Sequence, residues 1–252
     1  MRARDELAAE DPAGQTAEDG APRRRGFVRR LSGFAVRLVL WFVLISLGWI
    51  GLYRFVDPPI WTHLVAEEAR LGRVERAWRD LGAISPHLVR AVMAAEDARF
   101  CEHDGIDWQA TRAALDQTLS GKRLIGGSTI TQQTAKNVFL WHGRSWPRKG
   151  LEAGFALGME ALWPKPRIME VYLNVAEFDT GAFGAEAAAQ RYFGKPAAAL
   201  TLPEAALLAA VLPAPRDRSA SAPGRATRSR AGAIANGART LEASGRDTCV
   251  LD

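Results

Sequence analysis

Two kinds of hydrophobic pattern run along this chain, one continuous and one periodic. The continuous pattern extends from Phe34 to about Val56, where apolar residues are interrupted only by Arg37, Arg54 and a few small or polar residues. With its flanks, this stretch reaches the roughly 20 apolar residues that a helix needs to cross a bilayer. We therefore predict a membrane-spanning helix over residues 34–56.

A basic region before an apolar region is also the pattern of a cleaved signal peptide. The stretch is long for a signal core, however, and no small-x-small cleavage site follows it. Trp41, Trp49, Tyr53 and Trp61 suit the anchoring of a retained helix at the membrane interface. Arginines cluster before the helix, so the positive-inside rule places the N-terminus in the cytoplasm and the residues after about Asp57 on the outer side.

The two ends of the chain lack a clear apolar pattern. Residues 1–33 combine Asp, Glu, Ala, Gly and Pro with a run of arginines, which predicts a disordered basic cytoplasmic tail. Residues 216–252 are rich in Ser, Arg, Ala and Gly, and although residues 226–243 fit a helix, their apolar periodicity is weak. We predict a poorly specified C-terminal tail there.

The periodic pattern occupies residues 57–215, which we predict to fold as one all-α domain. No run of alternating β-branched residues predicts a strand in it. Ser85 and Pro86 suit the N-cap and first turn of one helix, and Thr129 with Gln132 fits a capping box at the start of another. The remaining expected helices cover residues 107–121, 145–162, 166–175, 183–192 and 203–211.

The composition of the chain limits the class of protein. Hydrophobic residues make up 48% of its 252 residues, too many for a disordered protein. A formal net charge of +5 suits nucleic acid, anionic lipid and phosphorylated substrates alike, and the predicted location outside the membrane argues against nucleic acid. Cys101 and Cys249 have neither the spacing of metal ligands nor that of a disulfide framework, so we predict two unpaired thiols.

The segment EDARFCEHDG, which begins at Glu96, brings three ionisable groups close together. Glu96 continues the apolar face of the preceding helix, so burial is expected to raise its pKa and fit it for general acid or base chemistry near neutral pH. A structural carboxylate that caps the following turn agrees with the sequence equally well. Asp97 and His103 are expected to support whichever role Glu96 has.

The segment GGSTITQQTAKN, residues 126–137, opens a helix with two glycines and two hydroxyl residues. Free backbone amides at a helix start can hold an anion. Gln132 and Lys136 lie four residues apart and share a helix face, so an amide and an ammonium group can meet one sugar or phosphate. Taken alone this signal is weak, because the lysine spacing of a nucleotide-binding phosphate loop is absent.

The segment RSWPRKGLEAGFALGMEALW gathers Arg144, Arg148, Lys149 and Glu152 near one helix end. Arg148 and Glu152 are four residues apart and therefore also fit an ordinary intrahelical ion pair. Together with Lys136, however, the cations of this segment exceed what one carboxylate requires. This surplus matches the charge of a diphosphate group.

In order and spacing these segments resemble the motifs of glycosyltransferase family 51, the peptidoglycan glycosyltransferases. EDARFCEHDG matches the first motif of the family, GGSTITQQTAKN the second and RKGLEAGFALGME the third. Residues 165–195 match the fourth motif and residues 200–215 the fifth, so the resemblance covers about residues 85–215. The chain is most similar to the monofunctional biosynthetic transglycosylases, because the signatures of a transpeptidase domain are missing.

The resemblance implies a lysozyme-like, all-α domain behind one transmembrane helix. It further implies that lipid II is polymerised into β-1,4-linked glycan strands and that undecaprenyl diphosphate is released, with inversion at the donor anomeric carbon. The expected location is a bacterial inner membrane, crossed once, with the catalytic domain in the periplasm. The implied partners are lipid II, the lipid-linked growing strand, membrane lipid and other cell-wall synthesis proteins, with no nucleic acid.

Carried over residue by residue, the resemblance makes Glu96 the base that takes the proton from the acceptor's 4-hydroxyl. Glu152 would assist the departure of the donor diphosphate. No cofactor is expected to be obligatory, although a divalent cation, Mg or Mn, at Glu152 fits this role. The residues implied to bind the diphosphate or the sugars, or to support the cleft, are Lys136, Arg144, Arg148, Gln132, Gln133, Ser128 and Asn174, with Asp97, His103 and Lys149 beside them.

Two other functions remain open from the sequence. A membrane-bound lytic enzyme uses the same plan of two carboxylates but does not need Lys136 or Arg144. A non-catalytic scaffold that keeps the fold predicts the loss of one carboxylate, and both Glu96 and Glu152 are present.

Overall fold

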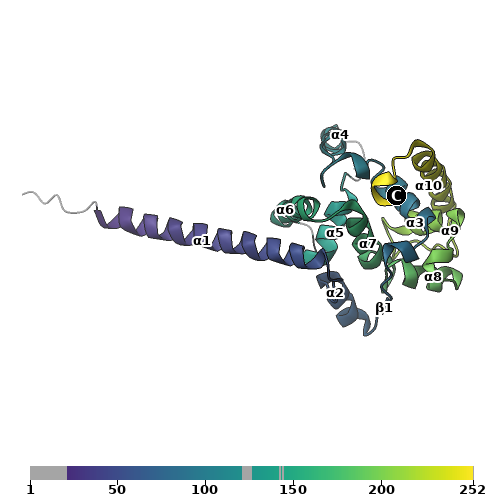
Figure 1. Ribbon diagram of the computed structural model, residues 1–252, viewed down its shortest axis with the longest axis horizontal. Helices are drawn as coiled ribbons and strands as arrows, with labels where there is room; N and C mark the ends of the chain where they lie inside the picture. Colours follow the sequence, from purple (N-terminus) through teal and green to yellow (C-terminus); the bar gives the residue numbers. More distant parts are fainter. Residues whose placement is uncertain (1–21, 121–126, 142, 144, 252) are drawn as a thin grey trace, which may run out of the picture. The chain divides into compact units, whose positions relative to one another are not determined.

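The computed structural model describes residues 22–120, 127–141, 143 and 145–251 (Figure 1). The chain divides into two units, Met1–Ile45 and Ser46–Asp252. Helices make up most of the described residues, which confirms the predicted all-α class. The α-helices are α1 (Pro22–Tyr53), α2 (Thr62–Leu71), α3 (Pro86–Glu96), α4 (Trp108–Leu119), α5 (Ile130–Phe139), α6 (Trp146–Leu162), α7 (Lys165–Val175), α8 (Ala185–Phe193), α9 (Leu202–Val211), α10 (Arg225–Ser244) and α11 (Thr248–Leu251), and the short 3-10 helices are η1 (Leu81–Ala83), η2 (Phe100–Glu102) and η3 (Ala197–Ala199).

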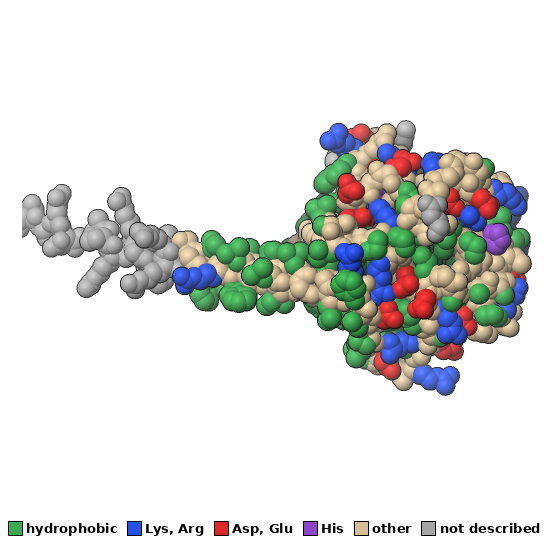
Figure 2. Space-filling view, in the orientation of Figure 1, with side chains coloured by type: hydrophobic (Ala, Val, Ile, Leu, Met, Phe, Trp, Pro, Cys, Tyr) green, Lys and Arg blue, Asp and Glu red, His purple; other side chains and the backbone are tan. Residues whose placement is uncertain are grey.

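Helix α1 contains the long apolar stretch. Its segment Ser32–Tyr53 has 22 residues with a mean hydropathy of 2.1, which is long and apolar enough to cross a membrane. Figure 2 shows hydrophobic side chains gathered along this helix. Residues 22–33 continue the helix where the sequence predicted a disordered tail, because arginine is itself a good helix former. Residues 1–21 of that predicted tail lie outside the described part of the chain.

The last turns of α1 belong to the second unit and form part of its core. Ile50 is buried, and its carbonyl accepts a hydrogen bond from Trp163 Nε1 at 2.7 Å. Gly158 of α6 permits this close approach, since a Cβ there would lie 2.8 Å from Ile50 Cδ1. Tyr53 stacks on Phe139 of α5 with 5.9 Å between ring centroids. The end of the apolar helix is therefore fixed to α5 and α6.

Two groups of helices form the body of the second unit. Helix α3 packs against α9 and α10, and α5 packs against α6 and α7 (Figure 1). Most apolar side chains of α3 are fully buried, among them Leu88, Val92 and Met93. Because α3 ends at Glu96 and α5 begins at Ile130, two buried helices position two of the segments that the sequence singled out.

A small three-stranded sheet packs against α8. Its strands are β1 (Glu75–Arg76), β2 (Glu177–Asp179) and β3 (Ala182–Phe183), in the order β1-β3-β2. Strand β1 runs parallel to β3, and β2 runs antiparallel to it. The sequence did not predict these strands, because two or three residues are too few to establish an alternating pattern.

One predicted helix cap is confirmed and another is wrong. Thr129 and Gln132 form the predicted capping box at the start of α5. Pro86 occupies the first turn of α3 as predicted, but the Ser85 side chain makes no capping bond. Instead, the buried Ser85 Oγ donates a hydrogen bond to the Leu200 carbonyl at 2.8 Å. A tertiary partner has replaced the local one.

The C-terminal residues fold against the domain, whereas the sequence predicted a poorly specified tail from residue 216. Helix α10 packs against α3 and α9 and buries Ile234 and Leu241. Small residues meet at one point of its contact with α3, where a Cβ added to Gly237 would lie 3.0 Å from Ala94 Cβ. Alanines and glycines pack closely without the large apolar side chains by which an amphipathic helix is recognised. The weak periodicity therefore concealed a buried helix.

Cys101 and Cys249 form a disulfide, so the prediction of two unpaired thiols is wrong. The two residues are 148 positions apart in the chain, and their Cα atoms lie 5.7 Å apart. The bond joins η2 to α11, two elements that also pack against each other. A pairing over this distance leaves no local sequence pattern. Disulfides persist in oxidising compartments, which agrees with the predicted location on the outer side of the membrane.

Candidate active site

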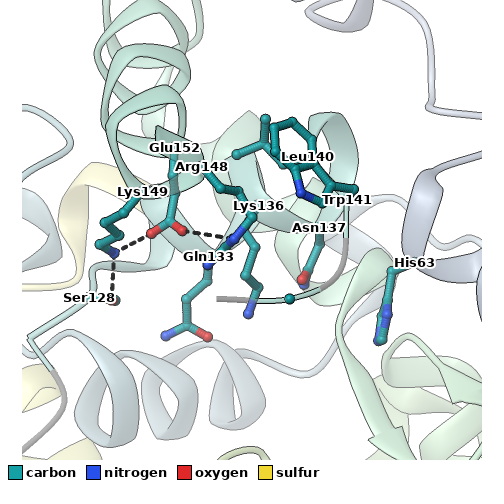
Figure 3. Close-up of a pocket in the computed structure, with 11 residues that line it drawn as sticks. His63, Ser128, Gln133, Lys136, Asn137, Leu140, Trp141, Arg148, Lys149 and Glu152 are labelled. Carbon is teal, nitrogen blue, oxygen red and sulfur yellow. Dashed lines mark hydrogen bonds and ion pairs between the residues drawn. The ribbon is translucent and has the colours of Figure 1, made fainter. Parts of the chain in front are cut away.

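The candidate site is a cavity of about 540 Å³ to which α2, α5 and α6 contribute (Figure 3). Figure 3 shows Glu152, Lys149 and Ser128 together on one side of the site, with His63 on the other side. The described residues that line the cavity are His63, Ser128, Gln133, Lys136, Asn137, Leu140, Trp141, Gly143, Arg148, Lys149 and Glu152.

A second cavity of about 230 Å³ adjoins the first, because Ser128 lines both. Glu96 and Asp97, at the end of α3, lie in this second cavity. Gln133 connects the two as well, since it lines the first cavity and its Nε2 donates to Glu96 Oε2 at 2.9 Å. The two candidate catalytic carboxylates, Glu96 and Glu152, therefore occupy neighbouring parts of one hollow region.

Glu152 is surrounded by cations from its own helix. Its Oε2 accepts a hydrogen bond from Arg148 Nη1 at 3.3 Å, and its Oε1 accepts one from Lys149 Nζ. Lys149 Nζ also donates to Ser128 Oγ at 3.0 Å, which ties α6 to the segment before α5. Glu152 and Arg148 are both buried, and these spacings of three and four residues place all three side chains on one face of α6.

Lys136 and Arg148 have hydrogen-bonding capacity that the protein leaves unused. Lys136 Nζ has no hydrogen bond or ion pair with any described residue. Arg148 Nε is buried and has no hydrogen-bond partner among the described residues either. Burial lowers the pKa of Lys136; Arg148 and Lys149 act in the same direction, and Glu152 and Glu96 oppose them. Three cations thus share one cavity with a single carboxylate. An anion that enters this cavity would relieve their mutual repulsion and fill the unused donors.

Glu96 lies in surroundings that favour its protonated form. Burial raises its pKa above the ordinary value, and the Gln133 hydrogen bond, Arg230 and Lys136 oppose this shift only in part. Its Oε1 is buried and has no hydrogen-bond partner among the described residues. A buried carboxylate with a raised pKa and a free oxygen is suited to accept a proton from a ligand. This agrees with the predicted raised pKa, and the role of Glu96 as a base stays a prediction.

Asp97 and His103 connect the end of α3 to the start of α5. His103 Nε2 lies 3.0 Å from both Asp97 oxygens, and Asp97 Oδ2 accepts a hydrogen bond from the Ile130 amide at 3.1 Å. Lys165 Nζ donates to the His103 carbonyl at 2.7 Å. These contacts connect the end of α3, where Glu96 lies, to α5; the supporting role of Asp97 and His103 in a reaction stays a prediction.

Three predicted site residues, His103, Gln132 and Asn174, line neither of the two cavities. The Gln132 side chain is buried in the capping box, where its Oε1 accepts from the Thr129 amide at 3.1 Å. The adjacent Gln133 reaches the cavity instead. It lies three residues before Lys136 and therefore shares a helix face with it. Asn174 is buried and bonds both backbone groups of Arg79 at 2.8 Å, so it supports the fold around the site.

Arg144 lies outside the described residues, so its predicted contact with a diphosphate stays a prediction. Other cavity residues were not predicted from the sequence. Asn137 lies four residues after Gln133 and could have been found by helical spacing. His63 comes from α2, where its Nε2 lies 3.3 Å from Glu177 Oε2, and no motif marks it.

The residues around Glu152 do not fit a resident metal ion. Both Glu152 oxygens already accept hydrogen bonds from protein cations. Among the described residues, no group of three or more His, Cys, Asp or Glu side chains could hold a metal. A divalent cation placed between Arg148 and Lys149 would also be repelled by both. We therefore assign no step of a reaction to a metal at this site.

Comparisons with known proteins identify related sequences over most of the chain. The sequence matches the model of the transglycosylase family over residues 64–238. It is 51% identical to a biosynthetic peptidoglycan transglycosylase of Rhodospirillum centenum, over 89% of this chain and 96% of that protein. It is 48% identical to a protein of the same name from Caulobacter vibrioides, over 89% of this chain and 98% of that protein. A further relative, from Marinomonas sp., is 47% identical over 79% of this chain and 85% of that protein.

Proposed function

Because the chain belongs to the transglycosylase family, we propose that it polymerises lipid II into β-1,4-linked glycan strands and releases undecaprenyl diphosphate. The family membership makes the chain a peptidoglycan glycosyltransferase of cell-wall biosynthesis with a lysozyme-like catalytic domain. The proposal adds the substrate, the leaving group and the stereochemistry. One observation carries it: a cavity with three cations and one carboxylate adjoins a second buried carboxylate that has a free oxygen.

In the proposed reaction Glu96 acts as the general base. It takes the proton of the acceptor's 4-hydroxyl while that oxygen bonds to the donor's anomeric carbon. The bond from this carbon to the diphosphate breaks, and the diphosphate leaves with the electron pair. Because the attack and the departure take place on opposite faces of the sugar, the base and the leaving-group site must be separate and the configuration inverts. The positions of Glu96 and Glu152 in neighbouring cavities support this division.

We assign the donor diphosphate to the cations of the first cavity. Lys136 and Arg148 offer N–H donors that no described residue uses, and Lys149 adds a third positive charge. Glu152 would hold Arg148 and Lys149 in the geometry that receives the phosphates, because it bonds to both. Charge-assisted hydrogen bonds of this kind stabilise the negative charge that develops on a departing phosphate.

The sugars would be contacted by groups that face the cavities. Gln133 lies between Lys136 and Glu96, and Ser128 lines both cavities, so both are suited to orient sugar hydroxyls. Gln132 and Asn174 instead act through the fold, by capping α5 and by holding the chain at Arg79.

The chain would carry out this reaction at a membrane. Helix α1 is a candidate span, and the disulfide suits an oxidising compartment such as the periplasm. We propose that α1 crosses a bacterial inner membrane once, with the N-terminus in the cytoplasm and the domain with Glu96 in the periplasm. The lipid tails of the substrate would then remain in the bilayer beside the enzyme. Contacts with other cell-wall synthesis proteins stay a prediction from the sequence.

A gel assay of chain growth from labelled lipid II tests the proposed function. The purified full chain in detergent or liposomes is expected to convert labelled lipid II into a ladder of glycan strands. Strands that instead become shorter would favour the lytic alternative, and failure to consume lipid II in either medium would contradict the proposal.

A second measurement tests the diphosphate site. Lys136→Met is expected to reduce kcat/KM for lipid II by about 10- to 100-fold, the equivalent of one hydrogen bond to a charged group. Lys195→Met is the matched control, because Lys195 pairs with Glu204 outside the cavity. Equal kcat/KM values for the two variants would remove Lys136 from the donor site.

A further inference from the structure

The C-terminal helix brings an arginine to the carboxylate at the end of α3. Arg230 projects from α10, which packs against α3 and α9 (Figure 1). Its Nη2 lies 3.7 Å from Glu96 Oε1 and 3.4 Å from the carbonyl oxygen of Ala95, to which it donates. One guanidinium group therefore contacts the backbone next to Glu96 and faces the Glu96 side chain.

We propose that Arg230 is a positioning residue for the proposed reaction, which keeps the Glu96 carboxylate ionised and its free oxygen directed toward the acceptor hydroxyl. This inference rests on the proposed role of Glu96 as the base. It assigns a function to α10, a helix that lies outside the sequence motifs and contributes none of the described residues that line the cavities.

The distance between the two groups suits this role. A close ion pair would occupy the carboxylate oxygen and reduce its capacity to accept a proton. At 3.7 Å, the positive charge acts on Glu96 while Oε1 keeps no hydrogen-bond partner among the described residues. The other oxygen, Oε2, is held by Gln133, whose Oε1 in turn accepts from the Tyr172 hydroxyl at 3.5 Å. The carboxylate is thus fixed through one oxygen and left free at the other.

The charged groups around Glu96 come from several elements. Asp97 follows it directly and disfavours a second negative charge. Lys136 of α5 and Arg230 of α10 favour the ionised form, and both act on a group whose burial opposes ionisation. Tyr172 of α7 is fully buried, and burial raises its pKa well above the ordinary value, so it stays neutral and adds no charge. Because Lys136 is assigned to the diphosphate of the donor substrate, Arg230 is the cation that remains for Glu96 when substrate is bound.

Several contacts hold α10 in the position that this role requires. Gly237 lies against Ala94, two residues before Glu96, without space for a larger side chain. Arg90 of α3 pairs with Glu242 at 3.0 Å and with Asp247 at 2.6 Å, on either side of the end of α10. The disulfide then joins the following helix to η2, a few residues after Glu96.

Arg230 also carries a cost that a purely structural arginine would avoid. Its Nε is buried without a hydrogen-bond partner among the described residues. Unsatisfied buried donors destabilise a fold and are rare in folded proteins. The side chain keeps this arrangement while its Nη2 faces Glu96, which is the pattern of a residue placed for function.

The test is the pH dependence of kcat/KM for lipid II in Arg230→Gln, Arg230→Lys and the wild-type chain. Without the charge, Glu96 should bind its proton more readily, so the acid limb of the Arg230→Gln profile should move to higher pH. On that limb we expect a loss of about fivefold, the effect of one charge pair near 4 Å in water, and a smaller loss on the alkaline plateau. Arg230→Lys should restore most of the wild-type profile.

Arg239→Gln is the matched control, because Arg239 lies on the same helix and contacts only Asn236 among the described residues. It should leave the profile unchanged. An equal loss at every pH in Arg230→Gln, with no rescue by lysine, would show a structural role only and would overturn the inference.

A second readout does not depend on activity. The free energy of unfolding of Arg230→Gln is compared with that of the parent chain, first with Glu96 present and then in a Glu96→Gln background. The loss caused by Arg230→Gln should grow as the pH rises through the titration of Glu96, and this growth should be absent in the Glu96→Gln background. Coupling without polymerisation would refute the proposed function alone, whereas polymerisation without coupling or a pH shift would refute the role of Arg230 alone.

Discussion

Glu96 is partly buried and Glu152 is buried, but the surroundings of the two carboxylates are opposite. Each oxygen of Glu152 accepts a hydrogen bond from a cation of the same helix. Glu96 accepts one hydrogen bond, from the neutral amide of Gln133, and its other oxygen has no such partner among the described residues. Burial alone therefore does not assign a role to an acidic side chain. The partners that surround it do.

The difference corresponds to two tasks in the transfer of a sugar. A carboxylate flanked by cations orders them, and ordered cations can receive a departing phosphate. A carboxylate with few partners in a dry cavity takes up a proton more readily, which is the task of a base. Removal of the negative charge is therefore expected to have different consequences at Glu96 and at Glu152.

The largest expected effect is on turnover at the Glu96 side. Glu96→Gln keeps the shape and the contact with Gln133 but removes the base, so kcat should fall about 10²- to 10⁴-fold. The measurement is the rate of lipid II consumption at saturating substrate. Glu102→Gln serves as control, because Glu102 is an exposed partner of Arg99. A kcat close to that of the wild type would end the assignment of Glu96 as base.

The second effect is on stability at the Glu152 side. Glu152→Gln leaves buried Arg148 without its counter-charge, which should lower the free energy of unfolding by about 3–5 kcal/mol. Urea unfolding of the detergent-solubilised chain measures this change. Glu204→Gln removes a more exposed pair and should lower it by only about 0–1 kcal/mol. Similar losses in the two variants would mean that the cations around Glu152 do not depend on it.

The third effect concerns the disulfide, which lies on the Glu96 side of the comparison. Replacing both Cys101 and Cys249 by serine should lower the free energy of unfolding by about 2–4 kcal/mol. The rate of polymerisation should decline more than the affinity of the first cavity for a diphosphate. The disulfide is attached to η2, a few residues after Glu96, whereas the cations of the first cavity on α6 are distant from it in the chain. Reduction of the wild-type chain should reproduce the result. Equal losses of binding and turnover would show that the disulfide supports both sides alike.

The smallest effect is a change in the pH dependence of stability. Burial raises the pKa of Glu96, so the folded chain binds this proton more strongly than the unfolded chain does. The resulting stability is present at acidic pH and is lost as the pH rises through the raised pKa. Glu96→Gln should therefore be more stable than the wild type at neutral pH, with the difference vanishing in acid. Unfolding experiments between about pH 4 and pH 8 measure it, and a less stable glutamine variant at neutral pH would contradict it.

Local features of the fold and site were predictable from the sequence. The capping box at Thr129 and the cations one helical turn before Glu152 depend on residues three or four apart, and such spacings are visible in a single chain. The same is true of Glu96, whose partial burial follows from its place beside the apolar face of α3. These features needed no knowledge of the tertiary arrangement.

The contact of Gln133 with Glu96 was not predictable from spacing alone. The sequence predicted that Gln132 caps α5, and its side chain does turn back to the Thr129 amide. Gln133 is left to reach Glu96, but the two residues are 37 positions apart in the chain, so only the tertiary arrangement brings them together.

The long-range features could not be predicted for a different reason. The pairing of Cys101 with Cys249, the contact of Arg230 with Glu96 and the position of His63 each join residues far apart in the chain. Helix α10 adds to the difficulty, because alanines and a glycine share its contact face with only two large apolar residues, Ile234 and Leu241. Hydrophobic periodicity detects large apolar side chains and misses this kind of packing.

The position of α3 between α9 and α10 also decides when the enzyme can become active. A ribosome makes α3 long before α10, so the part of α3 that α10 covers stays exposed until α10 has been made. A copy that is stalled or clipped before α10 would present this surface to proteases and would lack Arg230 beside Glu96. Such a copy is expected to be inactive and to be degraded.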